Sequence, residues 1–239
     1  MRYQLLPYLY SALYSAHTAG TMVTRALWMN FPSDSAALTV DRQFMLGDYL
    51  MVSPVLDEGV TSVSAYFPEG AWYSFADRNL TVVSPAGGST RSIFTPLTAT
   101  NVHVLGGGIL PLQRAALTTV AGRKTPFTLL VALATDGTAK GELFYDDGEQ
   151  IELNNNLRAS YSASAGSLSG VVSEATYSGA SSLEVEAVII MATEAFSAAP
   201  TVTLNDQAVS AAQVQVDGAT LTVSLEGALL INSDFTLSW

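Results

Sequence analysis

Short apolar segments separated by turn-forming residues run through most of this chain, and their spacing constrains its fold more than any other feature. They recur at roughly 8–12 residues, which is typical of antiparallel sandwiches and barrels. Tight turns such as Gly87-Gly88 separate them. The sequence predicts a mainly β chain with two antiparallel β-sandwich domains in series. The expected strands are 49–52, 62–67, 72–75, 79–83, 89–94, 101–105, 109–113, 127–134, 141–145, 184–189, 201–204, 213–216, 220–225 and 235–239.

The first 19 residues predict a helix instead. Its apolar positions recur at helical spacing, and Gly20 is suited to a left-handed stop. Tyrosines lie on the other faces, so this helix is expected to have neighbours on more than one side. After it, residues 22–31 alternate loosely, which predicts a strand. The spaced positions of the helix are Leu6, Leu9, Leu13 and Ala16.

The charge balance excludes some classes of partner. The net charge of −11 comes from 21 acids against 10 lysines and arginines, which argues against nucleic acid and anionic membrane surfaces. The absence of cysteine excludes disulfides and thiolate chemistry. No apolar run approaches the ~20 residues of a membrane span.

Residues 1–59 carry an ordered series of motifs. They comprise Arg2-Tyr3, Leu5 to Tyr10, His17-Thr18, Gly20, Arg25, Phe31-Pro32, Asp34, Asp41, Gln43-Phe44, Leu46 to Asp48 and Val52 to Leu56. In order and spacing they resemble the C-terminal portion of glycoside hydrolase family 31, the α-glucosidase family that includes maltase-glucoamylase, sucrase-isomaltase and lysosomal acid α-glucosidase. Further landmarks lie at 61–73, 101–113 and 145–148, and the resemblance fades after about residue 150. Gly108 stands where the family favours a large residue.

The resemblance implies three parts. Residues 1–20 would be the last helix of a truncated (β/α)8 catalytic barrel, 21–115 a proximal C-terminal β-sandwich and 116–239 a distal one. The parent would hydrolyse terminal α-glucosyl residues of α-glucan or maltooligosaccharide with retention. Its catalytic carboxylates would lie upstream, so no catalytic, substrate-binding or metal-ligating residue is assigned here and no cofactor is expected. The expected partner is the upstream barrel, and the chain alone is expected to be inactive and structural.

Several side chains could nevertheless carry chemistry. Asp41, Asp48, Asp57 and Glu58 are interpreted as turn, cap or surface groups. Asp146-Asp147-Gly148 predicts a hairpin turn rather than a calcium loop, because calcium needs about 6–8 oxygen ligands. The two histidines, His17 and His103, lie far apart without cysteine, so His103 is expected to be a hydrogen-bonded structural residue rather than a zinc ligand.

Aromatic and polar side chains leave further alternatives open. Trp28, Trp72 and Tyr73 could stack on sugar rings, but packing in the core or at the edge of a sandwich is favoured. Arg25 is expected to form an ion pair that joins barrel and sandwich. Asn79-Leu80-Thr81 fits an N-glycosylation acceptor and favours a secretory route, whether extracellular, lysosomal or in the endoplasmic reticulum.

Two other functions explain part of the pattern. A free-standing carbohydrate-binding β-sandwich module would account for the strands but has no need of a helix that is apolar on several faces. A pair of adhesion domains would account for the sandwiches and the low charge, but not for landmarks in family order.

Overall fold

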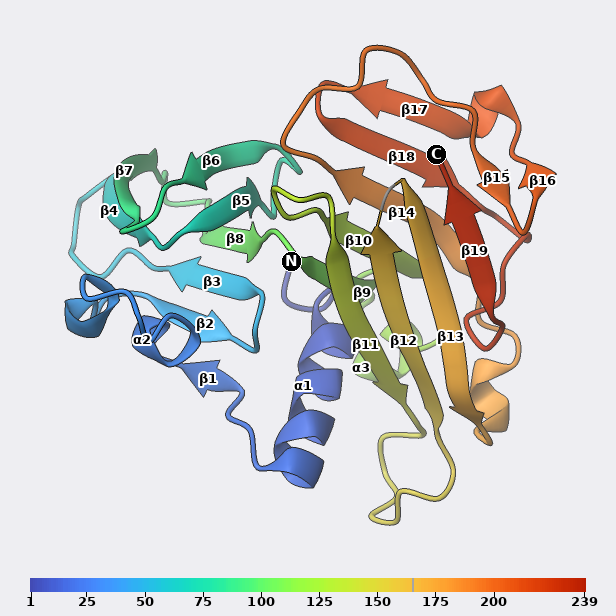
Figure 1. The fold of residues 1–239 in the computed structure, drawn as a ribbon. Helices are drawn as coiled ribbons and strands as arrows, with labels where there is room; N and C mark the ends of the chain where they lie inside the picture. The colour runs from blue at the N-terminus through green and yellow to red at the C-terminus, as the bar shows by residue number, and fades with distance from the viewer. Residues whose placement is uncertain (165) are drawn as a thin grey trace.

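The computed structural model describes residues 1–164 and 166–239, and it is mainly β, as the sequence predicts (Figure 1). One long helix, α1 (Leu6–Ala19), lies between two groups of strands. Shorter helical turns are α2 (Leu27–Asn30), α3 (Thr119–Gly122), η1 (Ala37–Thr39), η2 (Ser178–Ala180) and η3 (Ala211–Gln213). Within these ranges no helix is long and apolar enough to span a bilayer.

The first group of strands forms a six-stranded antiparallel sheet and a two-stranded one. The six-stranded sheet has the order β1-β2-β3-β8-β5-β6, and β4 pairs with β7. Alternation along β3 and β5 sends Met51 and Trp72 toward β4, and Leu50 and Tyr73 toward the opposite face. The strands are β1 (Thr24–Arg25), β2 (Phe44–Leu46), β3 (Leu50–Ser53), β4 (Ser62–Phe67), β5 (Gly70–Ser74), β6 (Leu80–Ser84), β7 (Ser89–Phe94) and β8 (Asn101–Leu105).

The second group forms one eleven-stranded sheet with the order β16-β15-β19-β13-β12-β11-β9-β10-β14-β18-β17. Strands from both ends of this sheet contribute to a single apolar core, which includes Leu237 and Val223. The strands are β9 (Gly108–Gln113), β10 (Phe127–Ala132), β11 (Ala139–Tyr145), β12 (Leu157–Ser164), β13 (Ser167–Ala175), β14 (Val185–Met191), β15 (Thr203–Leu204), β16 (Gln207–Ala208), β17 (Val214–Asp217), β18 (Thr220–Ser224) and β19 (Phe235–Ser238).

Pairing in the large sheet differs from the expected antiparallel pattern at two places. β10 runs parallel to β14, and β11 is parallel to β9 at the pair Lys140↔Gly108. Parallel neighbours need a long crossover, and the chain from β11 to β13 provides it for β10 and β14. β9 precedes residue 115 but pairs with β10 along its whole length, so strand pairing runs across that position.

The two groups of strands share a core. Leu50, Tyr73 and Val104 of the six-stranded sheet pack with Leu110 and Leu130 of the large sheet. Leu5 and Tyr8, at the start of α1, belong to the same cluster. The helix is thus held where the two sheets meet.

The ends of α1 follow the sequence closely. Gly20 adopts φ 68° as its left-handed cap, and its N–H donates to the carbonyl of Ala16 at 3.0 Å. Pro7 lies in the first turn, where its missing N–H costs no hydrogen bond. The buried face, however, is Pro7, Tyr8 and Ser11, whereas Leu6 and Leu13 of the predicted apolar row are exposed.

The prediction of a strand over residues 22–31 is wrong for most of its length. Only Thr24–Arg25 is a strand, and Leu27–Asn30 forms a helical turn closed by the bond from Phe31 N–H to Leu27 O at 3.0 Å. The amide of Asn30 donates to the carbonyls of Gly47 and Asp48, both at 3.2 Å, which holds this turn against the β2–β3 connection.

Gly108 is a close-packing position. A Cβ atom there would lie 2.5 Å from Cγ of Tyr49, so the Tyr49 ring occupies the space that a larger residue would need. The departure from the family pattern at Gly108 is therefore matched by an aromatic side chain on a neighbouring segment.

Candidate functional site

The inner face of α1 is bonded to both groups of strands. The Tyr8 hydroxyl donates to Leu46 O at 2.8 Å and accepts from Tyr49 N–H at 3.2 Å, and its burial raises the pKa of the phenol. The Ser11 hydroxyl donates to Pro7 O and accepts from the N–H of Phe144, both at 2.9 Å. These bonds fix the rotation of α1 about its axis, because Tyr8 and Ser11 lie on the same face of the helix.

Asp146 adds a second anchor for the helix. Its Oδ1 accepts from the Tyr10 hydroxyl at 2.9 Å and from Gly148 N–H at 2.8 Å. Nη2 of Arg123 lies 3.8 Å from the same oxygen. Burial and the hydrogen bond to Asp146 raise the pKa of Tyr10 to about 12. Arg123 also stacks on the Tyr145 ring, with its guanidinium carbon 4.4 Å from the ring centroid.

Asp146 and Asp147 are turn residues, as the sequence predicts, but they do not form a tight hairpin. They open the 146–156 connection between the antiparallel strands β11 and β12. Asp147 accepts from the N–H groups of Glu149 and Gln150, both at 2.9 Å, which lowers the pKa of its carboxyl. Across residues 1–164 and 166–239, no group of three or more His, Cys, Asp or Glu side chains could hold a metal ion.

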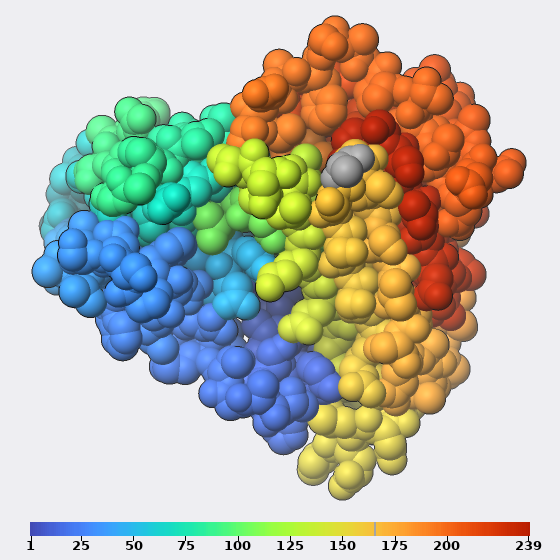
Figure 2. Space-filling view, viewed as in Figure 1, coloured from blue at the N-terminus to red at the C-terminus, as the bar shows by residue number. Residues whose placement is uncertain are grey.

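The outer face of α1 is apolar and uncovered. Tyr3, Leu6 and Leu13 are 45%, 39% and 54% exposed. Beside them lies a groove of about 320 Å³ whose lining includes Val120 of α3. Figure 2 shows the 146–156 connection, in yellow, next to the lower end of α1, in dark blue, and Ile151 on that connection is 92% exposed. We call this apolar surface the outer face of α1. It is formed by Leu6 and Leu13 of the helix, Tyr3 just before it, Val120 of α3 and Ile151 of the 146–156 connection.

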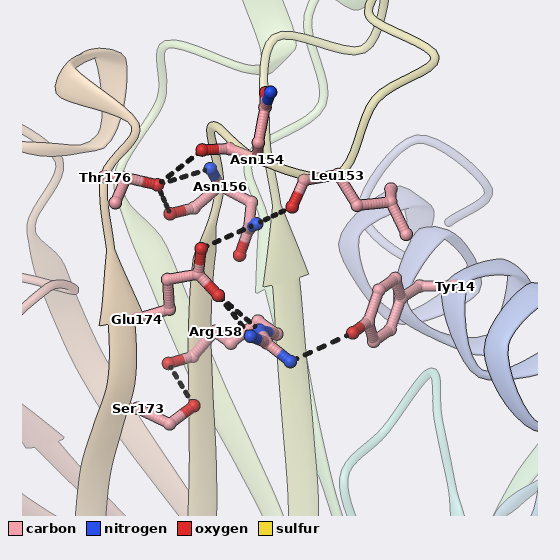
Figure 3. Close-up of polar contacts among 8 residues, drawn as sticks. All are labelled: Tyr14, Leu153, Asn154, Asn156, Arg158, Ser173, Glu174 and Thr176. Atoms are coloured by element: carbon pink, nitrogen blue, oxygen red, sulfur yellow. Dashed lines mark hydrogen bonds and ion pairs between the residues drawn. The ribbon is translucent and has the colours of Figure 1, made fainter.

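A polar network borders this face (Figure 3). Arg158 on β12 forms an ion pair with Glu174 on β13, and its Nη1 donates to the Tyr14 hydroxyl at 3.2 Å. The Tyr14 ring stacks on Phe144 with centroids 4.0 Å apart and planes 5° apart. The amide of Asn156 donates to Leu153 O at 2.7 Å and to Glu174 at 3.2 Å. The network ties the last turns of α1 to the large sheet.

The four acids near the family motifs lie at the surface. Asp48, in the β2–β3 turn, pairs with Arg25, and Asp57 pairs with Arg42. Asp41 and Glu58 are exposed. Arg25 therefore forms the expected ion pair, but with a partner in its own sheet rather than between helix and sandwich. Its Nε also donates to Met22 O, just before β1.

His103 departs from its expected environment. It is buried on β8 and lies edge-on to Phe67, with ring centroids 4.9 Å apart. Its Nδ1 has no hydrogen-bond partner in the described structure, so the prediction of a hydrogen-bonded residue is wrong at this atom. Burial lowers the pKa of His103 to about 4. His17 is exposed near the end of α1.

The aromatic candidates divide by burial. Trp72 and Tyr73 are fully buried and donate to Pro68 O at 2.8 Å and Leu133 O at 2.6 Å, which makes them core residues. Trp28 on α2 is exposed. Asn79 is exposed in the connection between β5 and β6.

A model of the glycosyl hydrolase family 31 C-terminal domain matches residues 20–110. An α-glucosidase of Hordeum vulgare is 52% identical over 152 residues, covering 64% of this chain and 17% of that protein. An α-glucosidase of Schizosaccharomyces pombe is 39% identical over 242 residues, covering 100% of this chain and 24% of that protein. This chain belongs to glycoside hydrolase family 31.

Solved structures of family 31 enzymes share the fold. A glucosidase II α subunit superposes with a TM-score of 0.88 at 24% identity, covering 100% of this chain and 28% of that one. A dextranase from Flavobacterium johnsoniae superposes with a TM-score of 0.78 at 21% identity, covering 98% and 31%. The family 31 chain described here thus spans about a sixth to a third of the length of these proteins.

Proposed function

We propose that this chain is the non-catalytic C-terminal region of a family 31 α-glucosidase, and that α1 seats it against the catalytic barrel of the same protein. The whole enzyme would hydrolyse terminal α-glucosyl residues of α-glucans or maltooligosaccharides with retention. The observation that carries the proposal is the contrast between the two faces of α1. One face is bonded to both sheets, and the other presents Tyr3, Leu6 and Leu13 to solvent.

The exposed apolar side chains of α1 are suited to burial against the proposed catalytic barrel. Burying large apolar side chains contributes about 1.5–3 kcal/mol each relative to leaving them exposed. A contiguous apolar surface of this kind is typical of an interaction site. The relatives named α-glucosidase are roughly four to six times as long as the segment they match, so their chains contain ample sequence for such a domain.

The proposed division of the chain places residues 1–20 in the barrel, 21–115 in the proximal sandwich and 116–239 in the distal one. The backbone bond from Gln113 N–H to Gln4 O, at 3.1 Å, links the first part to β9. β9 lies within the range of the proximal sandwich, but it pairs with β10, which lies in the range of the distal one. We propose that β9 is the strand through which the three parts are joined.

A structural role also fits the acids beside α1. A retaining glycosidase places two carboxyl groups about 5–5.5 Å apart across the scissile bond. Asp146 instead accepts bonds from Tyr10 and Gly148, and Glu142 accepts from the Ser15 hydroxyl at 2.6 Å. Both carboxylates are engaged in holding the helix.

Hydrolysis of 4-nitrophenyl α-glucoside tests the proposal. We expect turnover from the full-length protein and none from the purified 239-residue chain, which should also self-associate on size-exclusion chromatography. Turnover by the 239-residue chain that is abolished by changing one of its own acids would overturn it. A monomer that glucan retards would instead indicate a free-standing carbohydrate-binding module.

Substitution of the outer face tests the docking step. Leu6→Gln with Leu13→Gln should lower the thermal stability of the full-length protein but not that of the 239-residue chain. Leu117→Gln is a matched control, because Leu117 is equally apolar and 100% exposed but lies outside the groove beside α1. Equal stability of the full-length double variant and the control would contradict docking on α1.

A further inference from the structure

The connection between β5 and β6 is a rigid turn. Ser74 N–H donates to Asn79 O at 2.8 Å, and Arg78 N–H donates to Ser74 O at 3.0 Å. Arg78 has φ 60°, a left-handed conformation that reverses the chain just before Asn79. The backbone of residues 74–79 is therefore closed by its own hydrogen bonds.

Arg78 anchors this turn from inside. Its guanidinium carbon lies 4.0 Å from the centroid of the Phe75 ring, and burial lowers the pKa of the side chain to about 10. The Thr220 hydroxyl at the start of β18 donates to Arg78 O at 2.7 Å. Figure 1 shows the β5–β6 turn beside the large sheet in agreement with this bond. Because Arg78 is directed inward, the next residue is free to point outward.

Asn79 lies at the exposed side of the turn. Among the described residues, neither its carboxamide nor the hydroxyl of Thr81 takes part in a hydrogen bond. Asn79-Leu80-Thr81 is also the one Asn-x-Ser/Thr triplet in the 239-residue sequence. A substituent on the Asn79 amide would displace no contact of the folded chain.

β6 begins directly after Asn79 and is the last strand of its sheet. The strand order ends at β6, so within the described residues its outer edge pairs with no other strand. Val83 on this strand is exposed. Free edges with apolar side chains invite pairing with other chains, and proteins commonly cover them.

We propose that Asn79 carries an N-linked glycan and that this glycan covers the free edge of β6. N-linked glycans are bulky and solubilising and attach to Asn-x-Ser/Thr segments at the surface of secreted proteins. The modification places the protein in a secretory compartment. It is compatible with docking on α1, because in Figure 1 the β5–β6 turn lies toward the top of the molecule, whereas the end of α1 and the 146–156 connection lie at the bottom.

Mass spectrometry of the full-length protein from its own source tests the site. Peptide N-glycosidase converts a glycosylated asparagine to aspartate. We expect the peptide containing residue 79 to be found in its unmodified mass only after this treatment, with aspartate at position 79. Recovery of that peptide with an intact Asn79 before treatment, at full abundance, would overturn the proposal.

Variants expressed in a secretory host distinguish the effect of losing the glycan from the effect of the substitution itself. Asn79→Gln and Thr81→Ala should both remove the glycan, whereas Thr81→Ser keeps the acceptor triplet and should retain it. The two glycan-free variants should aggregate at least severalfold more on refolding than Thr81→Ser. Equal aggregation of all three would refute the edge-covering role. These outcomes are independent of glucosidase activity, so they do not depend on the proposed function.

Discussion

Two cores of the molecule are held together in different ways: the one between the β4–β7 pair and the six-stranded sheet, and the one inside the eleven-stranded sheet. Between the β4–β7 pair and the six-stranded sheet, buried polar side chains bridge the layers. The Gln43 amide donates to Ser53 Oγ at 2.9 Å and to Tyr66 O at 3.0 Å, and accepts from Tyr66 N–H at 2.7 Å. The core inside the eleven-stranded sheet contains apolar and tyrosine side chains, among them Leu129, Val188 and Leu237.

The two cores are expected to tolerate different substitutions. An apolar core tolerates swaps that keep volume, because its contacts are not directional. A hydrogen-bonded bridge requires donors and acceptors at fixed positions, and a buried group left unpaired costs about 1–3 kcal/mol. The packing around Gln43 is therefore expected to be more sensitive to side-chain chemistry, and the packing around Leu129 to side-chain volume.

The largest expected effect is a cavity in the core of the large sheet. Leu129→Ala should lower the free energy of unfolding by about 2–5 kcal/mol, because Leu129 is fully buried and its neighbours can close the cavity only in part. Leu129→Met should lower it by less than about 1.5 kcal/mol. Urea unfolding followed by fluorescence measures both, with Leu117→Ala as the exposed control. A Met variant as damaged as the Ala variant would contradict a core specified by volume.

The buried histidine of the first core predicts a pH dependence. The pKa of His103 is about 4 in the folded chain against 6.5 for an unperturbed histidine, because burial disfavours the charged ring, and nearby Asp77 offsets this only in part. Between these pH values the unfolded chain takes up a proton that the folded chain does not. Stability is therefore complete above pH 6.5 and falls as the pH drops toward 4, by about 3 kcal/mol in total.

Unfolding curves at pH 7 and pH 4.5 measure this term. His103→Gln should reduce the loss of stability between the two conditions, and His17→Gln serves as the control for replacing a histidine at an exposed position. Similar losses in the His103 variant and the wild type would show that His103 is not the group that titrates.

The Gln43 bridge gives the most direct comparison with Leu129. Gln43→Met keeps the side-chain length but removes the bonds to Ser53 and to the backbone of Tyr66. We expect a loss of about 1–3 kcal/mol, because the Tyr66 N–H is left without its acceptor. Leu129→Met is the matched control. If both methionine variants were equally stable, the contrast between the two cores would not hold.

The sequence predicted what depends on neighbouring residues along the chain. Alternation located most of the strands, and Gly20 marked the end of α1 as found. The motifs of the family resemblance include Gln43 and Asn101, whose side chains are buried and hydrogen-bonded, and His103, which is buried but has no partner for its Nδ1 in the described structure.

What the sequence did not predict depends on distant partners. The Tyr10–Asp146 bond joins residues 136 positions apart, and no local pattern reports it. The parallel pairing of β10 with β14 likewise follows from how the large sheet closes. At residues 27–30 the side chain of Asn30 overrides a loose alternation by bonding to the β2–β3 turn. The sequence predicted that α1 has neighbours on more than one side. Which of its residues face outward depends on the orientation of the helix, which the hydrogen bonds of Tyr8 and Ser11 set.

The smallest effects are expected at the surface, where the two groups of strands should behave alike. Arg42 pairs with Asp57 in the first group and Arg114 with Glu186 in the second. Both arginines are well exposed, so water and salt screen their charges and the long side chains lose entropy when paired. Arg42→Gln and Arg114→Gln should therefore shift the urea midpoint less than Gln43→Met does, and the small shifts should vanish in 1 M salt. A salt-resistant loss in Arg114→Gln alone would show that the partly buried Glu186 needs its partner.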